Sequence, residues 1–114
     1  GHPAPLLFDG PTPTEQSLRS LESSAFAIGM VPEWDFETET VTLGEGARLL
    51  IFSDGVFEIE CANGEMWHYH EFVKFIEQQP PTEPPLRERL YEHVHKMRGQ
   101  PLLNDDFSFV EVRY

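Results

Sequence analysis

The stretch that decides the fold of this chain is Leu49-Leu50-Ile51-Phe52-Ser53-Asp54-Gly55-Val56-Phe57-Glu58. Its first four residues are all apolar, which is typical of a strand that is covered on both faces. Asp54 follows this strand with only Ser53 between them. A carboxylate at the end of a rigid, buried strand is held in one direction, as a hard divalent cation requires of its ligand. Asp54 is therefore the first candidate metal ligand.

Upstream of this stretch the sequence predicts a β-hairpin. Residues 36–43 are rich in β-branched side chains and partly alternate, so we expect a strand there. Gly44-Glu45-Gly46 supplies a turn, which makes 36–53 a strand–turn–strand unit. The earlier residues predict a short extended segment over 1–10, a loop over 11–24 and a buried bend over 26–32.

Downstream, two amphipathic helices are predicted. Residues 67–78 place Phe72, Val73 and Ile76 inward, and Pro80-Pro81 stops the helix. Residues 86–98 carry apolar side chains on one face, begin after Pro85 and end at Gly99. The apolar face of this second helix comprises Leu86, Leu90, Val94 and Met97.

The chain then turns through a polar corner over 102–106 and closes with an apolar strand over 107–114, which we expect inside a sheet. Residues 56–60 fit either a strand or the start of a helix. Strands followed by two helices and one more strand predict an α+β fold. A sheet of these few strands would have exposed edges, so we expect further strands from outside this sequence.

Asp105 is the second candidate metal ligand. It lies in the connection between the second predicted helix and the closing strand, and it is followed by Asp106. If the closing strand lies near 49–52, Asp54 and Asp105 converge at one end of a sheet. Converging carboxylates repel unless a cation lies between them, and their oxygens favour Mn²⁺ or Mg²⁺. The alternative is turn and capping chemistry, which explains Asp-Gly and Asn-Asp-Asp without a metal.

Composition excludes several classes of protein. The 114 residues carry a net charge of −12, which would repel a nucleic-acid backbone. The single cysteine, Cys61, excludes an internal disulfide and a Cys-rich zinc site. No apolar run is long enough for a membrane helix, so we expect a soluble, cytoplasmic domain. His68 and His70, like His93 and His95, are two residues apart on predicted helices and cannot chelate from one face.

Five landmarks together resemble one protein family. The segments are Gly1-His2-Pro3-Ala4-Pro5-Leu6-Leu7, Ile28-Gly29, Val41-Thr42-Leu43-Gly44-Glu45-Gly46, the 49–58 stretch and Asp105-Asp106-Phe107-Ser108. In this order they are similar to the "GHPPPLL", "LG", "v-L-x-x-G", "LLLYTDGVTE" and "DDIT" motifs of bacterial metal-dependent serine/threonine phosphatases. These are the type 2C enzymes related to stage II sporulation protein E and to the sigma-B regulatory phosphatase.

The resemblance implies a fold and a chemistry. The fold would be a sandwich of two antiparallel β-sheets with helices outside. The reaction would be hydrolysis at a binuclear Mn²⁺ or Mg²⁺ site, without a phospho-enzyme intermediate. Asp54 and Asp105 match metal-binding positions of the family motifs. Gly55 would let the backbone pass close to the metals, and Asp106 would order the loop around them.

The resemblance also implies that residues 1–114 are the C-terminal portion of a single phosphatase domain. The family's first half, with its "GDVxGKG"-like motif and bridging Asp, has no counterpart in this sequence. We therefore expect this portion to be inactive alone and to pair with an N-terminal half. Ala47 replaces a usual Asp, and Met66-Trp67 replaces a usual "FG"; neither position is expected to bind metal.

These observations leave three hypotheses. In the first, the chain belongs to a phosphatase acting on a phosphorylated regulatory protein, in the family often an antagonist of an anti-sigma factor. In the second, a degenerate phosphatase fold serves as a protein-interaction module in signalling. In the third, the chain forms a homodimer through an exposed sheet edge. Nucleic acid and membrane are not expected partners under any of them.

Overall fold

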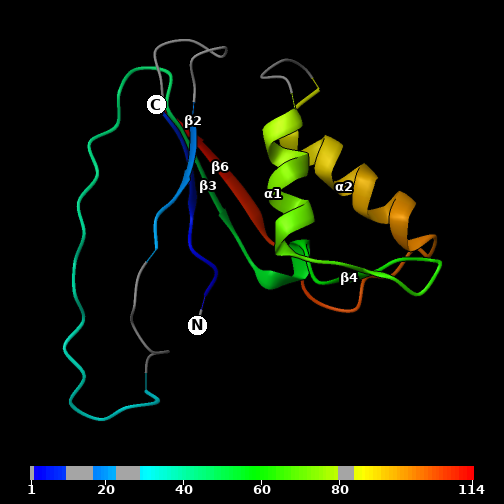
Figure 1. The fold of residues 1–114 in the computed structure, drawn as a ribbon, viewed down its shortest axis with the longest axis horizontal. Coiled ribbons are helices and arrows are strands. Elements are labelled where there is room, and N and C mark those ends of the chain that lie inside the picture. Colours follow the sequence, from blue (N-terminus) through cyan, green and yellow to red (C-terminus); the bar gives the residue numbers. More distant parts are fainter. Residues whose placement is uncertain (1, 10–16, 23–28, 80–83) are drawn as a thin grey trace.

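The computed structural model describes residues 2–9, 17–22, 29–79 and 84–114. Four strands form an antiparallel sheet in the order β2-β1-β3-β6, and β4 and β5 form a separate two-stranded sheet (Figure 1). The chain is mixed α+β, as predicted. The bounds of the strands are Leu6–Asp9 for β1, Ser17–Ser20 for β2, Arg48–Phe52 for β3, Ile59–Glu60 for β4, Met66–Trp67 for β5 and Phe109–Arg113 for β6.

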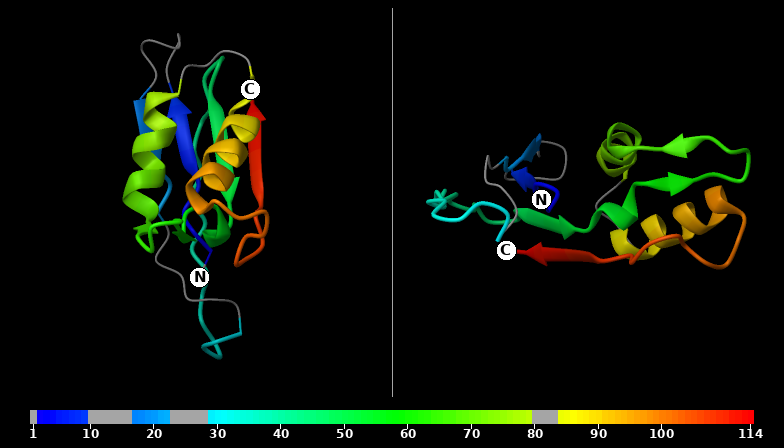
Figure 2. Two further views of the ribbon diagram at one scale, coloured as in Figure 1. Left: turned by 90° about the vertical axis from the view of Figure 1, so that its right-hand side faces the viewer. Right: turned by 90° about the horizontal axis from the view of Figure 1, so that it is seen from below.

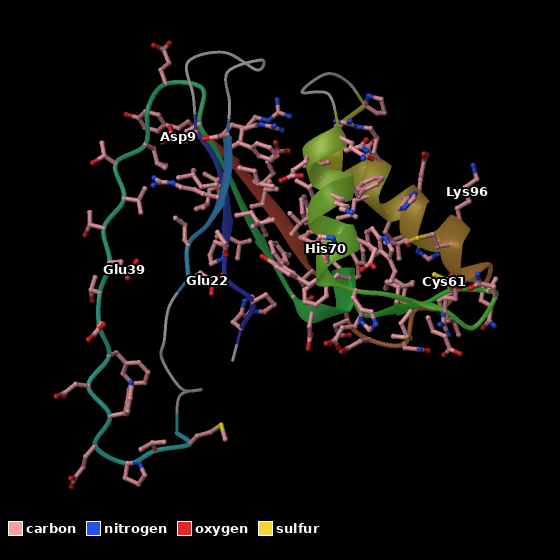
Figure 3. All side chains as sticks on the ribbon, in the orientation of Figure 1. Asp9, Glu22, Glu39, Cys61, His70 and Lys96 are labelled. Carbon is pink, nitrogen blue, oxygen red and sulfur yellow. The ribbon has the colours of Figure 1, made fainter. Side chains whose placement is uncertain are left out.

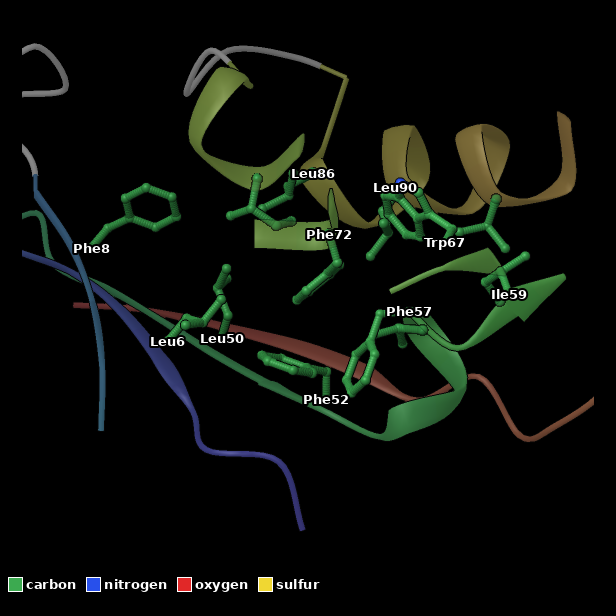
Figure 4. Close-up of a cluster of buried hydrophobic side chains, with 13 residues drawn as sticks. Leu6, Phe8, Leu50, Phe52, Phe57, Ile59, Trp67, Phe72, Leu86 and Leu90 are labelled. Carbon is green, nitrogen blue, oxygen red and sulfur yellow. The ribbon is translucent and has the colours of Figure 1, made fainter. Parts of the chain in front are cut away.

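Two helices, α1 (Tyr69–Gln78) and α2 (Leu86–Arg98), cover one face of the larger sheet (Figure 2). Between the helices and the sheet lies a single apolar core, in which Phe52 of β3 meets Phe72 of α1 with ring centroids 4.8 Å apart (Figure 4). The core consists of Leu6, Phe8, Leu50, Phe52, Val56, Phe57, Ile59, Trp67, Phe72, Ile76, Leu86, Leu90 and Val94.

Both predicted helices are confirmed. α2 has the predicted bounds, buries Leu86, Leu90 and Val94, and ends at Gly99, whose φ of 68° is the left-handed conformation of a C-cap. α1 buries Phe72 and Ile76 but begins at Tyr69 rather than at residue 67. The reason is that Trp67 already pairs with Ile59 in the small β4–β5 sheet. The predicted stop at Pro80-Pro81 lies outside the described residues.

The hairpin predicted over 36–53 is wrong in its first half. Residues 34–43 belong to no strand, and most of them are exposed. We call this segment the arm; it is a long coil set apart from the strands, and it leads into the turn before β3 (Figure 1). A strand forms only where a partner satisfies its backbone hydrogen bonds. None of the described strands pairs with the arm. The predicted turn is present at Glu45–Gly46, and the strand predicted over 49–52 is present as β3, which begins one residue earlier.

The loop predicted over 11–24 is also wrong in part, because residues 17–20 form β2. This strand pairs antiparallel with β1 from Leu6↔Ser20 to Asp9↔Ser17. Its polar sequence, Ser-Leu-Arg-Ser, fits an edge strand that is open to solvent. The rest of the loop prediction, over 11–16 and 23–24, lies outside the described residues. Of the buried bend predicted over 26–32, the described residues 29–32 do form a bend, but an exposed one.

Two predictions of burial fail in the same region. β3 was expected to be covered on both faces, yet its residues alternate and Ile51 is 37% exposed. The closing strand was expected inside the sheet, yet β6 is an edge strand with Val110 and Val112 exposed. The exposed side chains lie on the face of the sheet that the described helices do not cover, and β6 is at the edge because only β3 pairs with it among the described strands. Residues 56–60, left open between helix and strand, contain the end of a 3₁₀ turn and then β4.

A buried ion pair fixes the register of β6 against β3. Arg48 Nη1 lies 3.2 Å from Glu111 Oε1, and the Arg48 guanidinium also lies over the ring of Phe8. Arg113 approaches the same Glu111 oxygen at 3.3 Å. Leaving either buried charge without its partner costs about 3–5 kcal/mol, which opposes a shift of β6 along β3. That register pairs Phe52 with Phe109 and so sets the loops beyond them side by side.

Candidate metal centre

Asp54 begins a short 3₁₀ turn, Asp54–Val56, which is separated from the end of β3 only by Ser53. Its backbone carbonyl accepts hydrogen bonds from the N–H groups of Phe57 and Glu58, at 3.1 and 3.0 Å. Val56 and Phe57 are buried beneath this turn, whereas Asp54 itself is exposed. The backbone of Asp54 is thus fixed by the core, and its carboxylate is free of the core and accessible to a ligand.

Ser53 connects this turn to the corner that carries Asp105. Its hydroxyl donates to the carbonyl oxygen of Asp106 at 3.0 Å and accepts from the N–H of Ser108 at 3.2 Å. Its own N–H donates to the carbonyl oxygen of Ser108 at 3.0 Å. The sequence prediction missed this role. The available signal was a small hydroxyl residue directly before the candidate Asp at the end of a strand.

Gly55 allows the two segments to approach closely. A Cβ at this position would lie 2.9 Å from the carbonyl carbon of Asp106 and would clash with its oxygen. Only a residue without a side chain fits at this contact. The backbone of Gly55 thus approaches the segment predicted to share the metal site.

Asp105 and Asp106 lie in the corner between α2 and β6, and both are exposed. The N–H of Asp106 donates to Asp105 Oδ1 at 2.7 Å. This hydrogen bond orients the Asp105 carboxylate and leaves its second oxygen available. The structure therefore brings together the backbone segments of the four residues singled out by sequence, namely Asp54, Gly55, Asp105 and Asp106.

Asp54 also lines a surface hollow of about 360 Å³ with two acidic residues that the sequence prediction did not select, Glu22 and Glu58. Asp105 does not line this hollow. The other lining residues are Pro3, Ala4, Phe57 and Tyr69. Within the described ranges no group of three or more His, Cys, Asp or Glu side chains is arranged to hold a metal ion.

The histidines of α2 take part in aromatic packing. His93 stacks on Phe75 of α1, with ring centroids 4.3 Å apart, and contacts Trp67. Burial, aided by the charge of Lys96, lowers the pKa of His93 below its ordinary 6.5. His95 contacts Tyr91, which in turn contacts Phe107 beside the corner. These contacts give both histidines a packing role between the elements.

The family model described as Stage II sporulation protein E matches residues 1–114, the whole chain. Proteins of this kind are phosphatases of the type 2C class, which act on phosphoserine and phosphothreonine. The chain belongs to the stage II sporulation protein E family. No curated protein and no solved structure matches it. Within the described residues, no helix is long and apolar enough to cross a membrane.

Proposed function

We propose that this chain is the C-terminal portion of a metal-dependent protein serine/threonine phosphatase domain. The observation that carries the proposal is the junction of two loops at one end of the sheet, where Ser53 and Gly55 contact the backbone of Asp106. The family match supports the class of reaction. In the complete domain this portion would join an N-terminal half into the two-sheet sandwich typical of type 2C phosphatases.

Asp54 and Asp105 would hold Mn²⁺ or Mg²⁺. Their donor chemistry fits this group, since both present exposed carboxylate oxygens on backbone segments that the core and the Ser53 hydrogen bonds fix. Two carboxylates are too few for a binuclear site, so further ligands would come from outside the described residues. When bound, such metals supply Lewis-acid activation of water and neutralise charge on the phosphoryl group.

The chain's own residues would then perform three tasks. Asp54 and Asp105 would keep the metals at the end of the sheet, and Asp106 would order the loop by donating its N–H to Asp105. Gly55 would keep that loop close to the Asp54 turn. The substrate would be a phosphoserine or phosphothreonine of a regulatory protein, of the kind that antagonises an anti-sigma factor.

Replacement of Asp54 by Asn in the chain, extended upstream to a complete domain, tests this proposal. The amide keeps the size of the side chain but loses its charge, so manganese-dependent release of phosphate from a phosphoserine protein should be lost. The circular dichroism spectrum and the melting temperature should stay close to those of the parent, because Asp54 is exposed.

Glu39→Gln is the matched control, because it removes one exposed carboxylate from the arm and should retain full activity. Retained turnover in the Asp54→Asn domain would refute the assignment of Asp54. A folded parent domain that releases no phosphate would instead favour the alternative, a degenerate phosphatase fold that acts as an interaction module.

A further inference from the structure

The side chain of Arg98 joins three segments that meet beside the corner. Its Nε donates to the carbonyl oxygen of Leu102 at 2.8 Å, and its Nη2 donates to Asn104 Oδ1 at 2.7 Å. Its Nη1 donates to the carbonyl oxygen of Glu60, the last residue of β4, at 3.2 Å. One guanidinium therefore ties the end of α2, the end of β4 and the corner together.

The end of α2 and the β4–β5 turn, which we call the platform, are hydrogen-bonded to each other beneath Arg98. Gly99 ends α2 in a left-handed conformation, and the Ala62 N–H donates to the carbonyl oxygen of Met97 at 2.9 Å. The β4–β5 turn and the end of α2 thus lie side by side, near Cys61 and Lys96 in Figure 3. Arg98 extends from this platform to residues 102 and 104, directly before Asp105.

We propose that Arg98 is a positioning residue for Asp105, an inference that rests on the proposed metal role of that carboxylate. The corner is held at both ends, by Arg98 at residues 102–104 and by Ser53 at residues 106–108. Asp105 lies between these two attachments. Leu103 packs against the core, but without Arg98 the residues before Asp105 lose their side-chain hydrogen bonds. The Asp105 backbone, which approaches Gly55, is then held less firmly beside the Asp54 turn.

The geometry of the guanidinium explains why an arginine is needed. Three donors of one planar group reach three neutral oxygens, two on the corner and one at the end of β4. A lysine ammonium is a compact charge on a flexible stem and does not reproduce this fork. A general attraction between a positive charge and the C-terminal end of α2 would be kept by lysine. The Arg98→Lys variant therefore keeps the positive charge and loses the three-donor geometry, so it distinguishes the two contributions.

The test compares Arg98→Gln and Arg98→Lys with the parent, in the chain extended upstream to a complete domain. Arg87→Gln is the matched control, because Arg87 lies on the same helix with a side chain that is 63% exposed. Two quantities are measured on folded protein: the dissociation constant for Mn²⁺ by calorimetry, and the hydrogen-exchange rates of the Asp106 and Ser108 amides by NMR.

We expect both Arg98 variants to accelerate exchange at Asp106 and Ser108, because their hydrogen bonds depend on an ordered corner. We also expect weaker Mn²⁺ binding by roughly 10- to 100-fold, the usual cost of losing a partner that orients a metal ligand. Arg87→Gln should change neither quantity. A merely structural Arg98 would lower the melting temperature and leave the Mn²⁺ affinity of the folded domain unchanged.

Each other outcome is decisive. Unchanged exchange at both amides overturns the proposal, and so does faster exchange with parental Mn²⁺ affinity. A parent domain that binds no Mn²⁺ refutes the proposed metal function. In that case the exchange rates still decide whether Arg98 orders the corner.

Discussion

At the scale of single residues, Gly55 controls how closely the two loops of the candidate site approach each other. Its Cα lies against the backbone of Asp106, where rigid main-chain atoms leave no room for a methyl group. A flexible side chain could rotate away from an added Cβ, but a main-chain carbonyl in a hydrogen-bonded corner moves only with its loop. A side chain at Gly55 would therefore both destabilise the chain and move the two loops of the candidate site apart.

Gly55→Ala should destabilise the chain by about 1–3 kcal/mol, the usual cost of overpacking a tight contact. The free energy of unfolding from urea titration measures this change. Gly44→Ala is the matched control, because the nearest side-chain atom to its added Cβ, Asp9 Oδ1, lies at 3.8 Å. Equal stabilities of Gly55→Ala and Gly44→Ala would contradict the close approach.

Sequence reasoning at this scale found the residues that carry charge and missed those that arrange them. Asp54 and Asp105 could be selected because each follows or precedes a strand in a recognisable pattern. Ser53 was missed because its place before Asp54 was the only local signal, and the partners of its hydroxyl lie more than fifty positions away. Arg98 was missed for the same reason, since one of its three acceptors lies on β4.

At the scale of elements, helices were predicted well because their signals are local. The spacing of Leu86, Leu90 and Val94, with Gly99 after them, contains all that is needed to place α2. Strands depend on a partner that the local sequence does not show. The arm has a strand-like composition and no partner among the described strands, whereas the polar residues 17–20 form β2 because β1 lies beside them.

The contact between α1 and α2 should weaken in acid through His93. Its pKa in the folded chain is below the ordinary 6.5, so the unfolded chain binds the proton more tightly. Folding stability therefore falls as the pH drops below about 6.5, and the loss is complete once the pH is below the folded pKa. The free energy of unfolding, measured between about pH 7.5 and about pH 5.5, should show this slope.

His93→Phe should reduce that slope, because phenylalanine keeps a ring against Phe75 and carries no proton to bind. The comparison is between the two slopes, not the two stabilities, since the new ring also changes packing. Parallel pH profiles for the parent and the variant would show that His93 does not contribute.

At the scale of the whole molecule, the larger sheet has one face under the helices and one face with exposed apolar side chains. Ile51 and Val110 are paired across β3 and β6, and they are 37% and 54% exposed. Val112 on β6 is 44% exposed as well. Adjacent exposed apolar side chains on an edge strand favour association with another protein surface.

We expect the 114-residue chain alone to self-associate through this face, and more strongly as salt screens its net charge of −12. Light scattering at about 0.1 M and about 1 M NaCl measures the effect. Val110→Lys should reduce association at both concentrations. Thr40→Lys adds the same charge on the exposed arm and should leave association nearly unchanged. A chain that stays monomeric at high salt would contradict this expectation.

The arm has a further consequence for the connectivity of the chain. It is part of the connection between β2 and β3, yet β1 lies between those two strands and is hydrogen-bonded to both. A break in the arm would separate the polypeptide into two pieces that remain joined by the β1–β3 ladder. The arm therefore acts as a tether whose length is weakly constrained, since doubling a loop costs only about 0.6 kcal/mol. Inserted sequence, or even a whole additional domain, can be carried there while β1 and β3 stay in register.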